Sequence, residues 1–171
     1  FYHVLPKEEP HAQLLSFLGG HEGESGIVYR STRRKVEETA AFLQKKGVKA
    51  EAYHAGLPDA ERMRVQEAFR RDECPVVVAT VAFGMGIDKP DVRFVAHLDL
   101  PKNVEGYYQE TGRAGRDGDP AHCLLLYSAA DMAQLLYFAR QTEDEEQRSI
   151  AEKHAYAMLE LSLIHIPSPR D

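Results

Sequence analysis

Short runs of β-forming residues alternate with stretches of helical periodicity along most of the chain. The run Pro75–Thr80 is almost continuously apolar, which is typical of a strand buried on both faces of a parallel sheet. Elsewhere, apolar side chains at Val36, Ala40 and Leu43 recur with the spacing of one helical face. We predict strands over residues 26–29, 48–53, 75–80, 94–96 and 122–127.

Helices are predicted over the segments between these strands. One covers 33–46, a second runs from Pro58 to about Arg70 with Met63, Ala68 and Phe69 facing inward, and a third covers 104–111. Strands and helices in this order form right-handed βαβ units, so the predicted fold class is α/β, a doubly wound and mainly parallel sheet flanked by helices. Ligands bind such sheets at the carboxyl ends of the strands. The loops expected to bind ligands therefore follow residues 29, 53, 80 and 98.

The pattern changes after residue 127. The segment Ser128–Asp131 fits a capping box, and two helical stretches follow it. We therefore divide the chain into a sheet domain over 1–128, a helical appendage over 129–161 and a tail over 162–171. The tail fits no earlier pattern and resembles a translated vector or adapter read-through, so we expect it to be non-native. The chain begins with Phe1, so we expect it to be a piece of a longer protein.

Composition narrows the possible functions. Lys and Arg number 21 against 27 Asp and Glu, a net charge of −6, which argues against nucleic-acid binding by bulk positive charge. The two cysteines, Cys74 and Cys123, form no C-x-x-C pair, so we expect small core residues and no zinc box. No apolar run approaches the roughly 18 residues of a membrane span, and we expect no membrane partner.

The segment Gln109–Gly118 is the first candidate site. Its arginines, Arg113 and Arg116, are three positions apart among glycines, so both guanidiniums can reach outward. Guanidinium is always charged and binds phosphate bidentately, which favours an anion clamp. The alternative is a solvated glycine-rich turn with two surface arginines.

Three further candidates follow predicted strands. In Thr80–Asp88, a hydroxyl and two glycines can seat a phosphate, or can simply form a tight turn. His54 follows the predicted strand 48–53 and is a general base, a phosphate contact or a structural residue. Thr32 and Arg33 stand where a helix begins, and helix N-termini bind anions readily. No G-x-x-x-x-G-K-[ST] loop occurs anywhere in the chain.

The order of these segments resembles a known family. Residues 26–33, 53–57, 80–88 and 109–116 resemble motifs IV, IVa, V and VI of superfamily 2 helicases. The amino-acid sequences of 78–93 and 107–116 closely resemble those of RecQ DNA helicases, and the resemblance covers about Tyr2 to Leu161. DEAD-box RNA helicases are similar in fold but carry a His-Arg pair where this chain has Gln109 and Glu110.

The resemblance implies the second RecA-like motor domain of an ATP-dependent 3′–5′ DNA helicase active in repair and recombination. Arg116 would be the arginine finger on the γ-phosphate, and Arg113 would couple the nucleotide state to DNA. Gln109, Gly86 and Asp88 would contact the nucleotide, the last at the ribose.

The same resemblance implies a nucleic-acid track in which Thr32 and Thr80 hold the phosphates of a single strand, with Arg33 and His54 beside them. The implied partners are single-stranded and duplex DNA and the first RecA-like domain, which carries the Walker loop and most of the Mg²⁺ site for ATP. Without that loop, we expect the chain alone not to hydrolyse ATP. The alternative is a non-catalytic module that binds single-stranded nucleic acid or a partner.

Two departures from the family pattern affect the predictions. Family members often have Cys where Arg30 stands, which leaves the role of this position open. The helices after residue 127 resemble the start of the family's zinc-binding subdomain, but its cysteines are absent, so we predict no metal in this chain. No targeting segment is visible, which favours a bacterial cytoplasm and leaves a nuclear location open.

Overall fold

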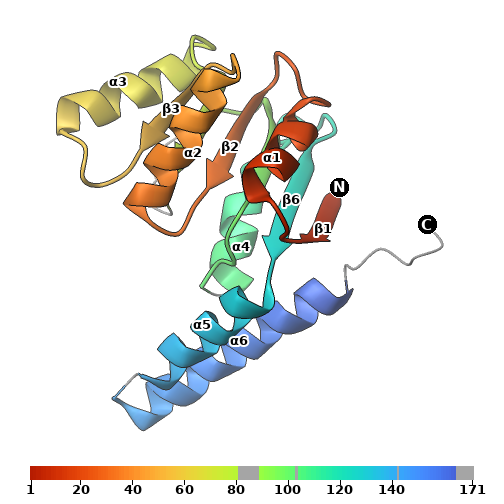
Figure 1. The fold of residues 1–171 in the computed structure, drawn as a ribbon, viewed down its shortest axis with the longest axis vertical. Coiled ribbons are helices and arrows are strands. Elements are labelled where there is room, and N and C mark those ends of the chain that lie inside the picture. The colour runs from red at the N-terminus through yellow and green to blue at the C-terminus, as the bar shows by residue number, and fades with distance from the viewer. Residues whose placement is uncertain (81–88, 103, 142, 165–171) are drawn as a thin grey trace.

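The computed structural model describes residues 1–80, 89–102, 104–141 and 143–164. Within these ranges the centre of the molecule is a six-stranded sheet with the order β1-β6-β5-β2-β4-β3 (Figure 1). Every pair of neighbouring strands in it is parallel. The strands are β1 (Tyr2–Pro6), β2 (Ser25–Tyr29), β3 (Ala50–Tyr53), β4 (Val76–Ala79), β5 (Val92–His97) and β6 (His122–Tyr127).

Helices cover both faces of this sheet. They are α1 (Pro10–Leu18), α2 (Arg33–Lys45), α3 (Asp59–Arg70), α4 (Val104–Thr111), α5 (Ala129–Arg140) and α6 (Glu145–Ile164). The first two pack on one face, where they share a core with Val28 and Leu124. On the other face, α3 packs against Ile27, and α4 and α6 pack against Leu125. Burial on both faces explains the continuously apolar strands, and the predicted doubly wound α/β class is confirmed.

One glycine in β2 is required by close packing. Gly26 pairs with Phe94 across the β2–β5 ladder, and a Cβ atom at this position would overlap the Phe94 ring. The ring therefore fills the space that a side chain at residue 26 would need, and this allows the two central strands to pack under α1.

The sequence analysis missed two elements and placed one side chain on the wrong face of a helix. The edge strand β1 and the helix α1 were not predicted, because β1 buries only Val4 and so carries no apolar alternation. Met63 was predicted to face inward but is 69% exposed, and Val65 is buried in its place. Residues that are two positions apart in a helix point about 200° apart around its axis, so Met63 and Val65 cannot share a face.

The helices α5 and α6 form a hairpin that follows the carboxyl end of β6 (Figure 1). One half of the predicted capping box is present, since the N–H of Asp131 donates to Ser128 Oγ at 3.1 Å, while the Asp131 carboxylate pairs with Lys7. Met158 of α6 is fully buried against Tyr107 and Leu125, which joins the hairpin to the sheet. None of the helices within the described ranges is both long and apolar enough to span a membrane.

Candidate functional site

The carboxyl ends of β2, β4 and β5 meet at one edge of the sheet. Ser31, Thr80 and Asp99, one from each of the loops that follow these strands, line the same small cavity of about 90 Å³. Thr32 lines an adjoining cavity with Ser31 and Asp99. Thr32 and Thr80 therefore lie on the same edge of the sheet, as the position of their loops predicts. These are the two threonines expected to hold the phosphates of a single nucleic-acid strand.

Thr32 is the N-cap of α2. Its Oγ1 accepts a hydrogen bond from the N–H of Lys35 at 3.2 Å, and the side chain remains exposed. The hydroxyl proton is still available to a phosphate oxygen. Arg33 is also exposed and lies over the turn at Gly56, next to His54.

His54 is buried and bonded through both ring nitrogens. Its Nδ1 accepts from the N–H of Gly56 at 3.0 Å, and its Nε2 lies 2.9 Å from Glu37 Oε1, to which it donates. These bonds shape the turn after β3, over which Arg33 of α2 lies. Direct contact between the imidazole and a phosphate requires one of these bonds to break.

Asp99 is the centre of a charge network that sequence reasoning missed. Its carboxylate accepts from the N–H of Ser31 at 2.8 Å and lies 3.1 Å from both Lys7 Nζ and Arg30 Nε. Lys35 Nζ lies 3.5 Å away. The available signal was the position of Asp99 just beyond the predicted strand 94–96, in a loop already expected to bind ligands.

The network stabilises the ionised form of Asp99. Burial by itself raises the pKa of this carboxyl, but the charge of Arg30, the Ser31 N–H and Lys7 outweigh burial and bring the pKa to about 2. Arg30 is itself buried, with 8% of its surface exposed. The Arg30 guanidinium thus balances a buried charge and fixes the loop that carries Thr32.

A second group of residues lies where α4 packs on β5. His97 and Glu110 are both buried and form a direct Nε2 to Oε2 contact, and the ring of Tyr29 stacks on His97 at 4.9 Å. Burial raises the pKa of Tyr29, as does the negative charge of Glu110, whereas the charge of Arg113 and its hydrogen bond act in the opposite direction. Arg113 is half-buried beside these groups.

Arg116 and Gln109 have a different environment, because both side chains are exposed. Arg116 Nε donates to the Gly112 carbonyl at 3.2 Å, and among the described residues no carboxylate lies within ion-pair distance of this guanidinium. The turn that carries it is held by Gly115, whose φ of +67° favours glycine and whose N–H donates to the Val92 carbonyl at 2.9 Å. Gly86 and Asp88 lie outside the described residues.

The cysteines are core residues, as predicted. Cys74 and Cys123 are each 5% exposed, and burial raises the pKa of both thiols to about 11. Within the described ranges, no group of three or more His, Cys, Asp or Glu side chains is arranged to hold a metal ion. The residues present therefore do not fit the family's zinc site.

Comparison with known proteins gives a consistent result. Residues 9–118 match the family described as the helicase conserved C-terminal domain. The chain is 52% identical over 149 residues to the ATP-dependent DNA helicase RecQ of Pasteurella multocida, covering 87% of this chain and 24% of that protein. It is 49% identical over 147 residues to the RecQ-like DNA helicase BLM of Xenopus laevis, covering 84% of this chain and 11% of that protein. The chain thus spans about a quarter or less of these relatives.

Solved structures with the same fold include two DEAD-box proteins. The structure of Escherichia coli SrmB bound to the regulator of ribonuclease activity A has a TM-score of 0.68 and 28% identity, covering 84% of this chain and 85% of that one. A DEAD-box protein from the hyperthermophile Methanococcus jannaschii has a TM-score of 0.68 and 29% identity, covering 81% and 38%. The shared fold is therefore the RecA-like one, whereas sequence identity is much higher with the RecQ proteins.

Proposed function

Because this chain belongs to the helicase conserved C-terminal domain family, and within it to the RecQ type, we propose that it is the second motor domain of an ATP-dependent 3′–5′ DNA helicase. Its relatives are named as ATP-dependent DNA helicases. In the intact protein, ATP and Mg²⁺ would lie between this domain and a first motor domain. The intact protein would unwind duplex DNA during repair and recombination.

The single observation that carries this proposal is the contrast between the two arginines of the 109–118 segment. Arg116 is exposed and, in the part of the chain that is described, lacks a carboxylate partner. It is therefore available to stabilise negative charge on a γ-phosphate bound by another domain. Arg113 is half-buried beside Tyr29, the last residue of β2. In this position its side chain can transmit changes at the nucleotide to the end of β2.

The nucleic-acid track would run along the carboxyl edge of the sheet. Thr32 and Thr80 would donate hydroxyl hydrogen bonds to the phosphates of a single strand, and Arg33 would add charge. Such contacts carry no base information, which suits a motor that moves along any sequence. Gln109, Gly86 and Asp88 would complete the nucleotide side, and His54 would shape the turn beside the track.

DNA is the proposed substrate because Gln109 and Glu110 stand where DEAD-box RNA helicases carry a His-Arg pair. Glu110 is buried and pairs with His97, so the interface between α4 and β5 accommodates a carboxylate at this position. A preference for RNA over DNA as the activating strand would contradict this part of the proposal.

DNA-stimulated ATPase activity tests the proposal. This chain is fused to a RecQ first motor domain, and the native fusion is compared with Arg116→Ala. We expect stimulated turnover in the native fusion and a loss on the order of 10³-fold or more in the variant, with unchanged thermal unfolding. Arg140→Ala, at an exposed position on α5, is the matched control and should retain full activity.

The outcomes separate the two candidate functions. If a folded native fusion with a competent first domain shows no DNA stimulation, the motor function fails and the non-catalytic binding module takes its place. The chain without the first domain should show no ATP hydrolysis, because it has no Walker loop. Hydrolysis by the chain alone would contradict a composite site.

A further inference from the structure

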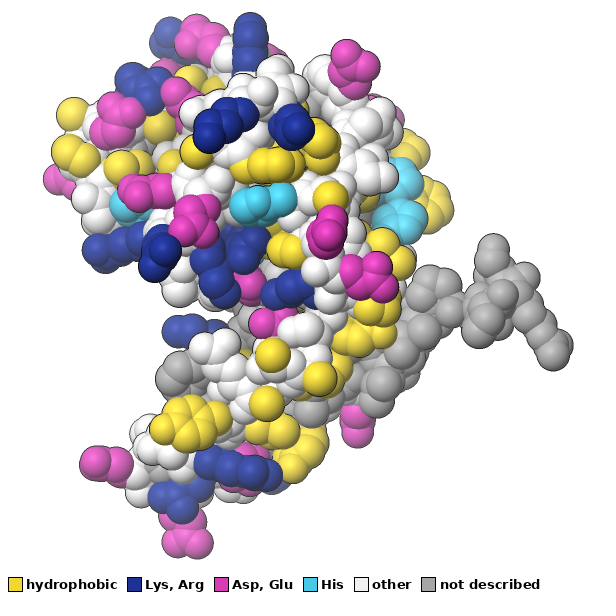
Figure 2. All heavy atoms as spheres, in the orientation of Figure 1, with side chains coloured by type: hydrophobic (Ala, Val, Ile, Leu, Met, Phe, Trp, Pro, Cys, Tyr) yellow, Lys and Arg dark blue, Asp and Glu magenta, His cyan; other side chains and the backbone are white. Residues whose placement is uncertain are grey.

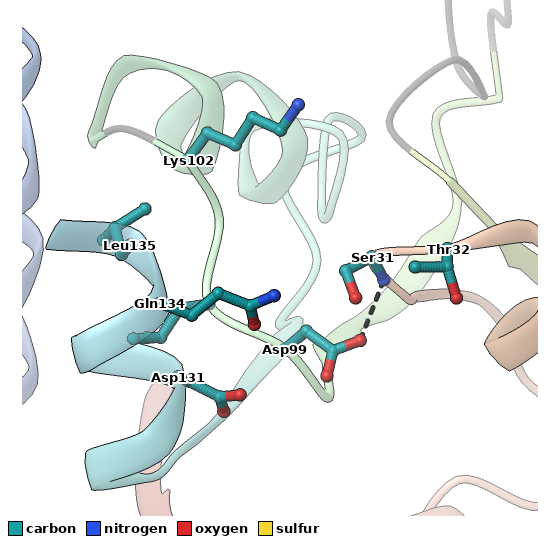
Figure 3. A pocket seen from close by; sticks show the side chains of 8 residues that line it. Ser31, Thr32, Asp99, Lys102, Asp131, Gln134 and Leu135 are labelled. Carbon is teal, nitrogen blue, oxygen red and sulfur yellow. Dashed lines mark hydrogen bonds between the residues drawn. The ribbon is translucent and has the colours of Figure 1, made fainter. Parts of the chain in front are cut away.

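A cavity of about 290 Å³ lies between the end of β2 and the helix α5 (Figure 3). Its volume is just below the roughly 300–1,000 Å³ of small-ligand sites, so the cavity has room for one nucleotide at most and not for a duplex. Ser31 and Thr32 line it from the β2 side and Gln134 from α5, with the Gln134 amide pointing toward Asp99 (Figure 3). The α5 helix belongs to the appendage, which sequence reasoning did not associate with any site.

The charges around the cavity favour an anion. Lys7 pairs with the carboxylates of both Asp99 and Asp131, at 3.1 and 2.5 Å, and Arg30 also pairs with Asp99, so these two cations together balance the two carboxylates. Lys102 lines the cavity, is exposed and forms no ion pair within the described ranges. Figure 2 shows Lys and Arg side chains along the edge of the sheet body that faces the α5–α6 hairpin. The local charge is therefore positive although the whole chain carries −6.

The other lining groups match the remainder of a nucleotide. The hydroxyls of Ser31 and Thr32 can donate to phosphate oxygens, and the amide of Gln134 can both donate and accept. Leu100 and Leu135 give the cavity an apolar wall on which a sugar or base can pack. Phosphate donors, a bifunctional amide and an apolar wall together fit a nucleotide better than a free phosphate ion.

We propose that this cavity binds one nucleotide of a single DNA strand, with its phosphate between Thr32 and Lys102 and its sugar or base against α5 and Gln134. The inference rests on the proposed function and deepens it, because it extends the nucleic-acid track from the sheet edge onto the appendage. The link between Lys7 and Asp131 holds α5 at the distance from the sheet that keeps the cavity open.

Fluorescence anisotropy with a labelled oligothymidine of about 12 nucleotides tests the proposal on the full chain at low salt. Gln134→Ala should weaken binding about 3- to 10-fold, as expected for the loss of one or two hydrogen bonds, without changing the salt dependence. Lys102→Ala should weaken binding and also reduce the slope of log affinity against log salt by about one. Gln141→Ala, exposed beyond the end of α5, is the matched control and should bind as the native chain does.

Thr32→Ala distinguishes the failure of this inference from the failure of the proposed function. If Thr32→Ala weakens binding but Gln134→Ala does not, the track exists and the cavity holds no nucleotide, which overturns the inference alone. If the native chain does not bind the oligonucleotide, or if Thr32→Ala also has no effect, the proposed nucleic-acid contacts are overturned as well. Gln134 is exposed, so circular dichroism should show an unchanged fold in its variant.

Discussion

Asp99 is a buried carboxylate that stabilises the fold only while it is ionised. Its pKa of about 2 in the folded chain is below its ordinary value of 3.8. The ionised form therefore contributes about 2 kcal/mol above about pH 4, and this contribution is lost as the pH falls through about 2. The network also explains Arg30, since a buried guanidinium requires a carboxylate at this distance.

Asp99→Asn should lower the free energy of unfolding at neutral pH by about 3 kcal/mol, because it leaves the buried Arg30 without its carboxylate. Urea denaturation measures this change. Between about pH 4 and pH 2, the variant should lose less stability than the native chain. Asp59→Asn, whose side chain is 87% exposed, is the control and should change stability little. Equal acid sensitivity of the native chain and the Asp99 variant would show that Asp99 is not the titrating group.

The helix α2 connects local structure to the candidate track, because one threonine, Thr32, both caps the helix and lines the cavity. Thr32 was singled out from sequence for its place before a helix, and the structure adds that its Oγ1 accepts the cap hydrogen bond. The predicted bounds of α2, α3 and α4 agree with the structure to within one residue at each end, since periodicity and turn residues are local signals. By contrast, β1 is held by its pairing with β6, which lies about 120 residues away in sequence.

Thr32→Ala should reduce the free energy of unfolding by about 1 kcal/mol, the usual cost of losing an N-cap. Thr32→Ser keeps a hydroxyl and should restore both stability and oligonucleotide affinity. Thermal unfolding of the three chains measures the first effect, and anisotropy measures the second. If Thr32→Ser fails to restore stability, the threonine methyl group and not the cap hydrogen bond is what stabilises α2.

The sheet and the α5–α6 hairpin share a core, although sequence reasoning divided the chain at residue 128. Met158 of α6 is fully buried against Val4, Tyr107 and Leu125. The hairpin is therefore tied to the edge of the sheet formed by β1 and β6. We expect these two parts to unfold in one cooperative transition.

Met158→Ala should cost about 2–5 kcal/mol because it leaves a cavity between the hairpin and the sheet. Ile150→Ala, on the same helix but 47% exposed, is the matched control and should cost about 0.5 kcal/mol or less. Circular dichroism and tyrosine fluorescence should report the same transition midpoint in each variant. Separate midpoints would mean that the hairpin unfolds independently of the sheet.

Local patterns in the sequence were sufficient for the fold class and for most helices and strands, and they indicated the edge of the sheet where we propose that ligands bind. They were sufficient because periodicity, capping residues and strand ends depend on neighbours a few positions away. The Asp99 network, the burial of Arg30 and the cavity between Ser31 and Gln134 depend on the tertiary structure. Their members lie in the loops directly after β1, β2 and β5 and on α5, and only the folded sheet brings these segments within ion-pair distance.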